Sequence, residues 1–317
     1  MTVCEPKVYL LGRQQVDDQD LEQFLRDIGA EDFQTDAASP GEVLVEVGGR
    51  VCYLSFANPR PGGMRAYADN ILRSDHTSVL EHAVFTLMVT GVSRSLTHEL
   101  VRHRHASPSQ LSQRYVDESA CEVVVPPALR TEVHQAWGYL LGYGPPDAHM
   151  TDPRPWQNME VISRAIAGCP DPTVMAGLVW LRSNQQASED YKVLSDYLYN
   201  REKEAAEQEA RKRHEGNWCK TFEIADMQAV RTAVRKKARE AARSVLPNAT
   251  ETKIQLTLNA QAARHLFYRR GSKHADPEIR NLAVRVFDRL SADSPNLFQD
   301  ITKLEDGTLS SPLWRDC

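Results

Sequence analysis

Short runs of β-forming residues and one helical stretch mark the first part of the chain. Val8–Leu11, Val43–Val47 and Val84–Val89 are brief, apolar and rich in branched residues, so each predicts a strand. Between the last two runs, the apolar residues of 64–74 fall at the spacing of an amphipathic helix. The Pro- and Gly-rich segment 58–63 precedes this helix and predicts a loop.

Helical patterns dominate the remainder of the chain. Ser93 is a candidate N-cap for a helix that runs to about His103, because a serine hydroxyl satisfies the free amides at a helix start. Residues 121–125 and 248–258 are predicted to be extended. Further helices are predicted over residues 185–213, 226–244, 259–270 and 276–292.

The order of these elements predicts an α+β fold in which a mixed sheet packs against helices. Tyr143–Pro155 is dense in Pro and Gly and predicts a loop or an insertion in the middle of the chain. We therefore expect a single domain over residues 1–317 that contains an inserted helical portion.

Composition narrows the class of protein. Lys and Arg total 38 against 43 Asp and Glu, a net charge of −5, so any anion site is local and no nucleic-acid partner is expected. The six cysteines are scattered without metal-type spacing. No secretory signal and no apolar run of about 20 residues is present, so we expect a cytoplasmic protein with free thiols and no membrane partner.

Residues 102–115 carry the densest chemistry. This segment holds three arginines, two histidines, three serines and two glutamines within fourteen residues, and it begins where a helix is predicted to end. The planar fork of arginine suits phosphate groups and the carbonyl edges of flat rings, and hydroxyls and amides add short-range hydrogen bonds. These side chains together favour a site for a phosphorylated heterocycle.

Two other readings of this region are weaker. His98-Glu99 begins like the zinc motif H-E-x-x-H, but the fifth position is Arg102, and His103 is turned about 140° away on a helix. We therefore expect no metal site. A basic nucleic-acid patch that includes Tyr115 conflicts with the acidic total and the shortness of the segment.

Four ordered motifs resemble those of the flavin-dependent thymidylate synthases. Arg102-His-Arg, seven residues and Ser112 resemble the family signature R-H-R-x7-S. The other three are His76–His82, which is similar to H-x-S-x-x-E-H, Ala238–Pro247, which is similar to A-R-x-x-L-P, and the C-terminal helices Asn259–Arg270 and His274–Arg280. The resemblance covers about 43–125 and 225–300, and residues of about 129–225 look like an insertion.

This resemblance implies a homotetrameric enzyme with active sites shared between subunits. Its cofactor is FAD, its co-substrates are NADPH and methylenetetrahydrofolate, and its reaction converts dUMP to dTMP. Arg270 stands at the catalytic arginine position. The residues implied to bind FAD are Ser78, Arg102, His103, Arg104, Gln110, Asn259, Ala260, Gln261 and His265. Those implied to bind the nucleotide are Glu99, Arg102, Gln110, Leu111, Ser112, Gln113, Arg114, Arg243 and Arg270.

The sequence departs from the family pattern in places. Pro108 stands where an aromatic or aliphatic residue is common, and Gln261 stands where many members have arginine. Some family members methylate UMP in nucleoside-antibiotic pathways, so UMP remains an alternative substrate. A non-catalytic nucleotide-binding module is a second alternative, whereas a purely structural helical protein leaves residues 102–115 unexplained.

Overall fold

The chain, described from a computed structural model, divides into two compact units. The structure describes residues 4–58, 60–143, 158–213 and 220–314. The sheet unit comprises Glu5–Gln110 and Lys253–Cys317, and the helical unit comprises Met1–Cys4 and Leu111–Thr252. Strands and helices both contribute to the fold, so the predicted α+β class is confirmed.

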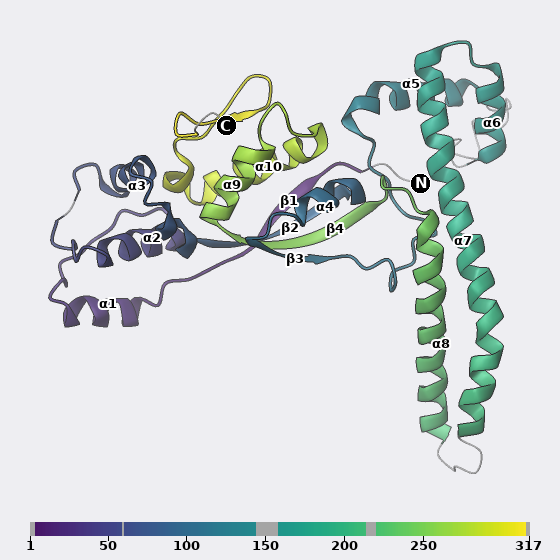
Figure 1. Cartoon of the computed structure of the whole chain (residues 1–317), viewed down its shortest axis with the longest axis horizontal. Coiled ribbons are helices and arrows are strands. Elements are labelled where there is room, and N and C mark those ends of the chain that lie inside the picture. The colour runs from purple at the N-terminus through teal and green to yellow at the C-terminus, as the bar shows by residue number, and fades with distance from the viewer. Residues whose placement is uncertain (1–3, 59, 144–157, 214–219, 315–317) are drawn as a thin grey trace. The chain divides into compact units, whose positions relative to one another are not determined.

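The sheet unit is built on a four-stranded sheet of order β1-β2-β4-β3, which crosses the centre of Figure 1. Strand β1 is antiparallel to β2, and β3 is antiparallel to β4. Its strands are β1 (Lys7–Arg13), β2 (Val84–Ser93), β3 (Ala106–Gln110), β4 (Glu251–Asn259), β5 (Thr302–Lys303) and β6 (Leu309–Ser310). Its helices are α1 (Asp18–Asp27), α2 (Pro40–Val51), α3 (Gly63–Arg73), α4 (Arg94–Leu100), α9 (Ala260–Arg270) and α10 (Pro277–Asp293), with 3₁₀ turns η1 (Thr77–His82) and η5 (Pro295–Phe298).

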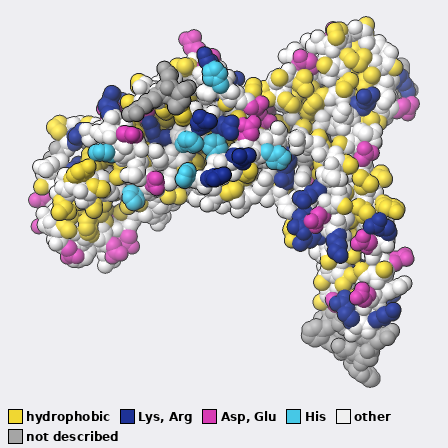
Figure 2. Space-filling model, viewed as in Figure 1, with side chains coloured by type: hydrophobic (Ala, Val, Ile, Leu, Met, Phe, Trp, Pro, Cys, Tyr) yellow, Lys and Arg dark blue, Asp and Glu magenta, His cyan; other side chains and the backbone are white. Residues whose placement is uncertain are grey.

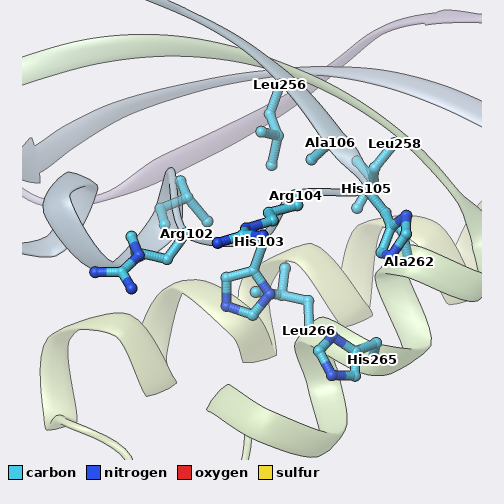
Figure 3. A pocket seen from close by; sticks show the side chains of 11 residues that line it. Arg102, His103, Arg104, His105, Ala106, Leu256, Leu258, Ala262, His265 and Leu266 are labelled. Atoms are coloured by element: carbon cyan, nitrogen blue, oxygen red, sulfur yellow. The ribbon is translucent and has the colours of Figure 1, made fainter.

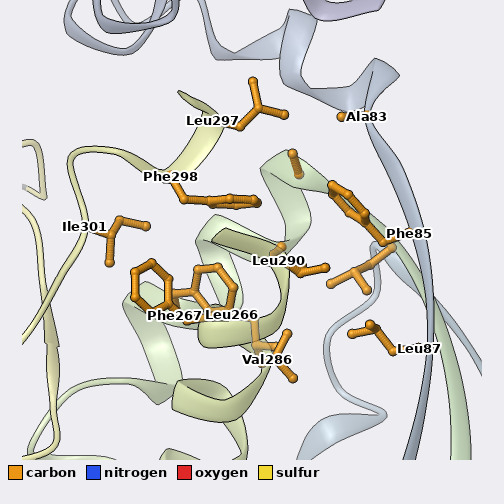
Figure 4. Close-up of a cluster of buried hydrophobic side chains, with 14 of the residues drawn as sticks. Ala83, Phe85, Leu87, Leu266, Phe267, Val286, Leu290, Leu297, Phe298 and Ile301 are labelled. Atoms are coloured by element: carbon orange, nitrogen blue, oxygen red, sulfur yellow. The ribbon is translucent and has the colours of Figure 1, made fainter. Parts of the chain in front are cut away.

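One face of β2 packs against the C-terminal helices to form the core of the sheet unit. Phe85 and Leu87 alternate along β2 and are buried, as the strand prediction requires. Figure 4 shows them facing Phe267 of α9, Leu290 of α10 and Phe298. Burial of these large side chains fixes α9 against the sheet, and α9 carries several of the candidate site residues.

The strand predicted at Val43–Val47 is wrong, because this segment lies within helix α2. Ser39 is its N-cap and accepts a hydrogen bond from the Glu42 backbone amide at 3.3 Å. Pro40 follows at the first helical position, where its missing N–H is not needed. The Ser39-Pro40 pair therefore begins a helix.

Other predictions for the sheet unit hold with adjusted ends. Strands β1 and β2, and helices α3, α9 and α10, lie where the sequence pattern places them. Ser93 caps α4 as predicted, but the helix ends at Leu100 and not near His103. Arg264 on α9 is buried, and its Nη1 and Nη2 each donate to a carboxylate oxygen of Asp300 at 2.7 Å, so it is a structural residue.

The helical unit is dominated by a hairpin of two long helices (Figure 1). Its elements are η2 (Pro127–Leu129), α5 (Arg130–Tyr143), α6 (Met159–Gly168), α7 (Pro172–Arg213), α8 (Lys220–Ala242) and η4 (Arg243–Val245). A separate hydrophobic core joins α5, α6 and the first half of α7 through buried Val133, Leu140, Ile162 and Leu178. The sequence pattern predicted residues 185–213 of α7 and missed residues 172–184. The loop prediction at 143–155 lies almost entirely outside the described residues.

The extended segment 121–125 forms only an isolated bridge, so the predicted strand there is wrong in extent. Val123 pairs with Thr250, and the Val124 amide donates to the Ala249 carbonyl at 2.8 Å. Val123, Val124 and Val125 are buried, which explains the apolar run in the sequence. Burial alone does not require pairing with another strand.

Among the helices of the described residues, none combines the length and the hydropathy of a membrane span.

Candidate active site

The start of helix α4 is fixed by hydrogen bonds from two directions. Ser93 Oγ accepts from the Leu96 amide at 3.0 Å, which caps the helix. The carboxylate of Glu278 on α10 accepts from the Ser93 amide at 2.8 Å and from its hydroxyl at 2.7 Å. Glu278 therefore clamps α10 to the helix that leads into Arg102–His105, here called the R-H-R segment.

The R-H-R segment forms a turn between α4 and β3. The Arg102 and His103 amides donate to the carbonyls of the last turn of α4 at 3.1 Å, which reverses the chain. Strand β3 then pairs with β4 as the last strand in the sheet order, so Pro108 interrupts no central ladder. Pro108 is thus compatible with the local fold.

Arg270, the last residue of α9, is held between Glu99 of α4 and His103 of this turn. Its Nη1 lies 2.7 Å from Glu99 Oε2, and its Nε donates to His103 Nε2 at 3.2 Å. Because His103 Nε2 accepts this bond, a neutral His103 carries its proton on Nδ1. The guanidinium is only partly exposed, and its plane is set by two partners that are distant in sequence.

Two imidazoles beside Arg270 stay neutral at ordinary pH. Burial, followed by the positive charges of Arg270, His265 and Arg269, lowers the pKa of His103 to about 4. Burial also lowers the pKa of His265, and nearby Arg269, His105 and Arg270 add to the shift. The two rings of His103 and His265 meet edge to face at 5.8 Å.

Two cavities in the sheet unit share three residues. The first, of about 220 Å³, has an apolar floor that includes Leu256 and Leu258 and a rim of basic side chains from the turn (Figure 3). The second, of about 330 Å³, is lined by Glu81, His105, Asn259, Gln261, Ala262 and His265. His105, Ala262 and His265 belong to both. Figure 2 shows Arg, Lys and His side chains gathered on this face of the unit.

The start of α9 places further candidate residues beside the second cavity. Asn259 caps the helix by accepting from the Ala262 amide at 2.8 Å, and Ala260 donates to the Ala83 carbonyl at 2.8 Å. Gln261 Nε2 donates to Thr77 Oγ1 at 3.1 Å, which ties it to η1, the turn that carries exposed Ser78. The neutral amide therefore has a defined local role where a guanidinium was expected.

The remaining candidate residues lie in the helical unit. Leu111, Ser112, Gln113 and Arg114 are half-buried in the loop after β3, and Arg114 Nη2 lies 2.9 Å from Glu240 of α8. Arg243 stands three residues beyond Glu240, on the same side of the helix end. Arg114 is therefore held near the end of α8, the helix that Arg243 directly follows.

Four arginines follow each other at four-residue spacing on α8 and its end. Arg231 pairs with Glu207 at 2.7 Å, Arg235 lies over the Tyr199 ring at 4.9 Å, and Arg239 pairs with Asp117 at 2.8 Å. Arg243 is exposed, and no partner for its guanidinium is found within the described ranges. It is therefore the member of this row that is available to an outside anion.

The structure thus groups the candidates in two sets. Arg102, His103, Arg104 and His265 line the first cavity, and Asn259 and Gln261 line the second. Arg270 and Glu99 meet beside His103, whereas Ser78 and Ala260 line neither of these two cavities. Gln110 lies apart from both linings, with its amide bonded to Thr97 at 2.8 Å. Sequence reasoning missed His105, although it lies inside the R-H-R segment, and the alternating β4 leucines, whose inward period was visible in the predicted strand. Among the described residues, no cluster of three or more His, Cys, Asp or Glu could hold a metal.

The α+β architecture and this arginine- and histidine-lined turn match one family. The chain belongs to the Thy1 family, described as thymidylate synthase complementing protein, whose model matches residues 35–296. The resemblance to flavin-dependent thymidylate synthases is thereby confirmed.

Individual relatives agree with this assignment. A flavin-dependent thymidylate synthase of Mycolicibacterium gilvum (strain PYR-GCK) is 39% identical over 288 residues, covering 89% of each chain. One from Mycobacterium tuberculosis (strain ATCC 25177 / H37Ra) is 36% identical over 287 residues, covering 88% of each. The solved UMP/dUMP methylase PolB from Streptomyces cacaoi, bound with 5-Br dUMP, shares the fold with a TM-score of 0.53 at 18% identity, over 94% of this chain and 96% of that one.

Proposed function

We propose that this chain is a flavin-dependent methyltransferase that converts dUMP to dTMP, with methylenetetrahydrofolate as the carbon donor and NADPH as the reductant of FAD. Membership of the Thy1 family and the similarity to flavin-dependent thymidylate synthases support the activity. The observation that carries the proposal is Arg270, a permanently charged fork held at a fixed orientation beside a basic cavity.

The residues around the two cavities fit a flavin. An apolar floor suits a flat ring system, and guanidinium and imidazole groups on the rim suit ring carbonyls and phosphates. Arg102, His103, Arg104 and His265 would hold FAD from the first cavity, and Asn259 and Gln261 would hold it from the second. Ser78 and Ala260 are further proposed FAD contacts from η1 and α9. Gln110 is a further proposed FAD contact from β3. When bound, FAD supplies the electrons, taken from NADPH, that reduce the transferred carbon to a methyl group.

Arg270 would stabilise the charge that develops on the pyrimidine. For C5 of the uracil to attack an electrophilic carbon, negative charge must first build up on the ring carbonyl and N3, and a fixed cation beside those atoms would stabilise that charge. His103 keeps this cation in place because its neutral Nε2 accepts from Nε. Glu99 neutralises Arg270 in the absence of substrate and would orient it once the nucleotide enters.

The nucleotide phosphate would bind to the helical-unit set. Arg243 is available to an anion, and Arg114 is held by Glu240 near the end of α8, so these two cations would share one phosphate. Ser112 and Gln113 add hydrogen-bonding groups from the same loop, Leu111 adds an apolar contact, and Gln110, Glu99 and Arg102 complete the proposed nucleotide set. We further propose a cytoplasmic homotetramer in which subunits share active sites.

UMP is the second candidate substrate. Fold similarity to a UMP/dUMP methylase supports it. The two nucleotides differ by one hydroxyl, and a pocket that is not built to reject that group discriminates by only about 10²-fold.

One assay series tests the proposal. The purified protein should bind FAD, oxidise NADPH and methylate dUMP with methylenetetrahydrofolate, with UMP measured in parallel. A protein that binds nucleotide but neither takes up FAD nor oxidises NADPH would favour the non-catalytic module. Faster methylation of UMP than of dUMP would reassign the substrate while leaving the chemistry intact.

A further inference from the structure

The loop that carries Ser112–Arg114 is fastened to α8 just beyond its nucleotide-binding residues. Arg239 reaches from α8 to this loop, where its Nη1 donates to the Tyr115 carbonyl at 2.5 Å and its Nη2 to Asp117 Oδ2 at 2.8 Å. One guanidinium therefore holds both a backbone and a side-chain acceptor, a two-point contact that a single charge cannot reproduce.

The far side of the loop is fixed independently by α7. Ser188 Oγ donates to the Ser119 carbonyl at 2.9 Å, and the Ser119 amide donates to Asp117 Oδ1 at 2.9 Å. Both oxygens of Asp117 are thus engaged, one by the loop itself and one by Arg239. The loop is held from both helices of the hairpin, and Asp117 is where the two attachments meet.

The electrostatics agree with this geometry. Partial burial by itself would raise the pKa of Asp117, but hydrogen bonds from Ser119 and Arg239 bring it below its ordinary value. The Arg239 side chain is only 13% exposed, whereas Asp117 is 57% exposed. Arg239 is therefore enclosed and committed to the loop, and it is not a surface residue that samples many partners.

We propose that Arg239 is a positioning residue for nucleotide binding, which sets the conformation of the Ser112–Asp117 loop and thereby the placement of Arg114. This inference rests on the proposed function, because it takes the nucleotide as the ligand of that loop. Arg114 has its own anchor in Glu240, one residue further along α8, so Arg239 and Glu240 together define where the Arg114 guanidinium lies. A loop released from Arg239 loses this preorganisation before the ligand arrives.

The test compares variants of the full-length protein with dUMP as the probe. Arg239→Ala should raise the Kd and KM for dUMP about tenfold or more, because two charge-assisted hydrogen bonds are lost. The kcat at saturating dUMP and the Kd for FAD should stay near wild type, since ground-state loop order is what changes. Arg239→Lys should be intermediate, because an ammonium reproduces only one of the two contacts.

Asp117→Ala provides a second variant that removes an exposed partner and should therefore fold. Asp117→Ala should weaken dUMP binding less than Arg239→Ala does, because it leaves the contact with the Tyr115 carbonyl. The double variant should have the same Kd for dUMP as Arg239→Ala alone, since both changes remove the same attachment. Lys237→Ala, an exposed change on the same helix, is the matched control.

Binding of dUMP by Arg239→Ala and Asp117→Ala within twofold of Lys237→Ala would overturn the inference. An equal loss of FAD and dUMP binding would also overturn it, because Arg239 would then be a general stability residue. A wild-type protein that binds no dUMP would refute the proposed function instead, so the two failures are distinguishable.

Discussion

At the residue scale, the chemistry depends on a neutral histidine that accepts a hydrogen bond from an arginine. His103 is an acceptor only while its Nε2 is unprotonated, and its low pKa maintains that state across the physiological range. Protonation of His103 would place a second cation against Arg270 and break the contact that orients it. The pair therefore predicts a specific pH dependence of stability.

Unfolded His103 takes up a proton near its ordinary pKa of about 6.5, whereas the folded residue does so near 4. Between these values the unfolded state binds more protons, so stability falls as pH decreases through this window. We expect the melting temperature of wild type to drop more steeply between pH 7 and about 4.5 than that of His103→Gln, whose amide oxygen still accepts from Arg270.

Differential scanning calorimetry across this pH range measures the effect. His134→Gln removes an exposed histidine of α5 and should retain the wild-type dependence of melting temperature on pH. His265 also has a lowered pKa, but it is present in every variant and contributes equally to each curve. Parallel curves for wild type and His103→Gln would show that His103 does not titrate in this way.

At the element scale, the close approach of α5 and α7 depends on one glycine. A Cβ at Gly177 would overlap the backbone carbonyl of Glu132, and a backbone atom cannot move aside as a flexible side chain can. Gly177→Ala should therefore destabilise the helical unit by about 1–3 kcal/mol despite the better helix propensity of alanine.

Gly138 on α5 is the matched control, because a Cβ there meets nothing within 4 Å. Gly138→Ala should stabilise the same unit by about 0.5–1 kcal/mol through helix propensity alone. Urea unfolding of both variants gives the comparison, and equal effects in the same direction would contradict the close packing of α5 and α7.

Elements whose apolar residues follow a regular period were predictable from the sequence. Elements whose conformation depends on packing against other parts of the chain were not. Phe85 and Leu87 alternate because β2 has a single apolar face, so the strand was visible. Val43–Val47 imitates that alternation, yet Ser39 and Pro40 begin a helix whose one buried face includes the charged residues Glu42, Glu46 and Arg50 and so does not read as an apolar stripe. Residues 172–184 of α7 were missed because their apolar side chains pack against α5 and α6. The helical periodicity of those two helices is itself weak, so the sequence did not indicate the core that they form.

The candidate site shows the same division. The R-H-R segment was found from residue types alone, because its concentration of arginine and histidine needs a partner anion. The contacts of Arg270 with His103 and Glu99 join positions far apart in the chain, and no local pattern encodes them. Arg239 was likewise invisible, since it resembles its neighbours on α8 until its partners Tyr115 and Asp117 are seen.

At the scale of the whole molecule, the proposed site residues are divided between the two units. The flavin set and Arg270 belong to the sheet unit, whereas Arg114 and Arg243 belong to the helical unit. Loss of FAD binding and loss of dUMP binding should therefore be separable by mutation. Arg270 is the residue where the two ligands are proposed to meet.

The central claim is that Arg270 stabilises negative charge on the pyrimidine during reaction at C5. Release of tritium from [5-³H]dUMP follows substitution at C5 and measures the claim most directly. For Arg270→Ala we predict a loss of about 10²–10³-fold in the rate of release, the usual effect of removing one preorganised donor, with FAD affinity near wild type. Tritium release at the wild-type rate in this variant would contradict the account.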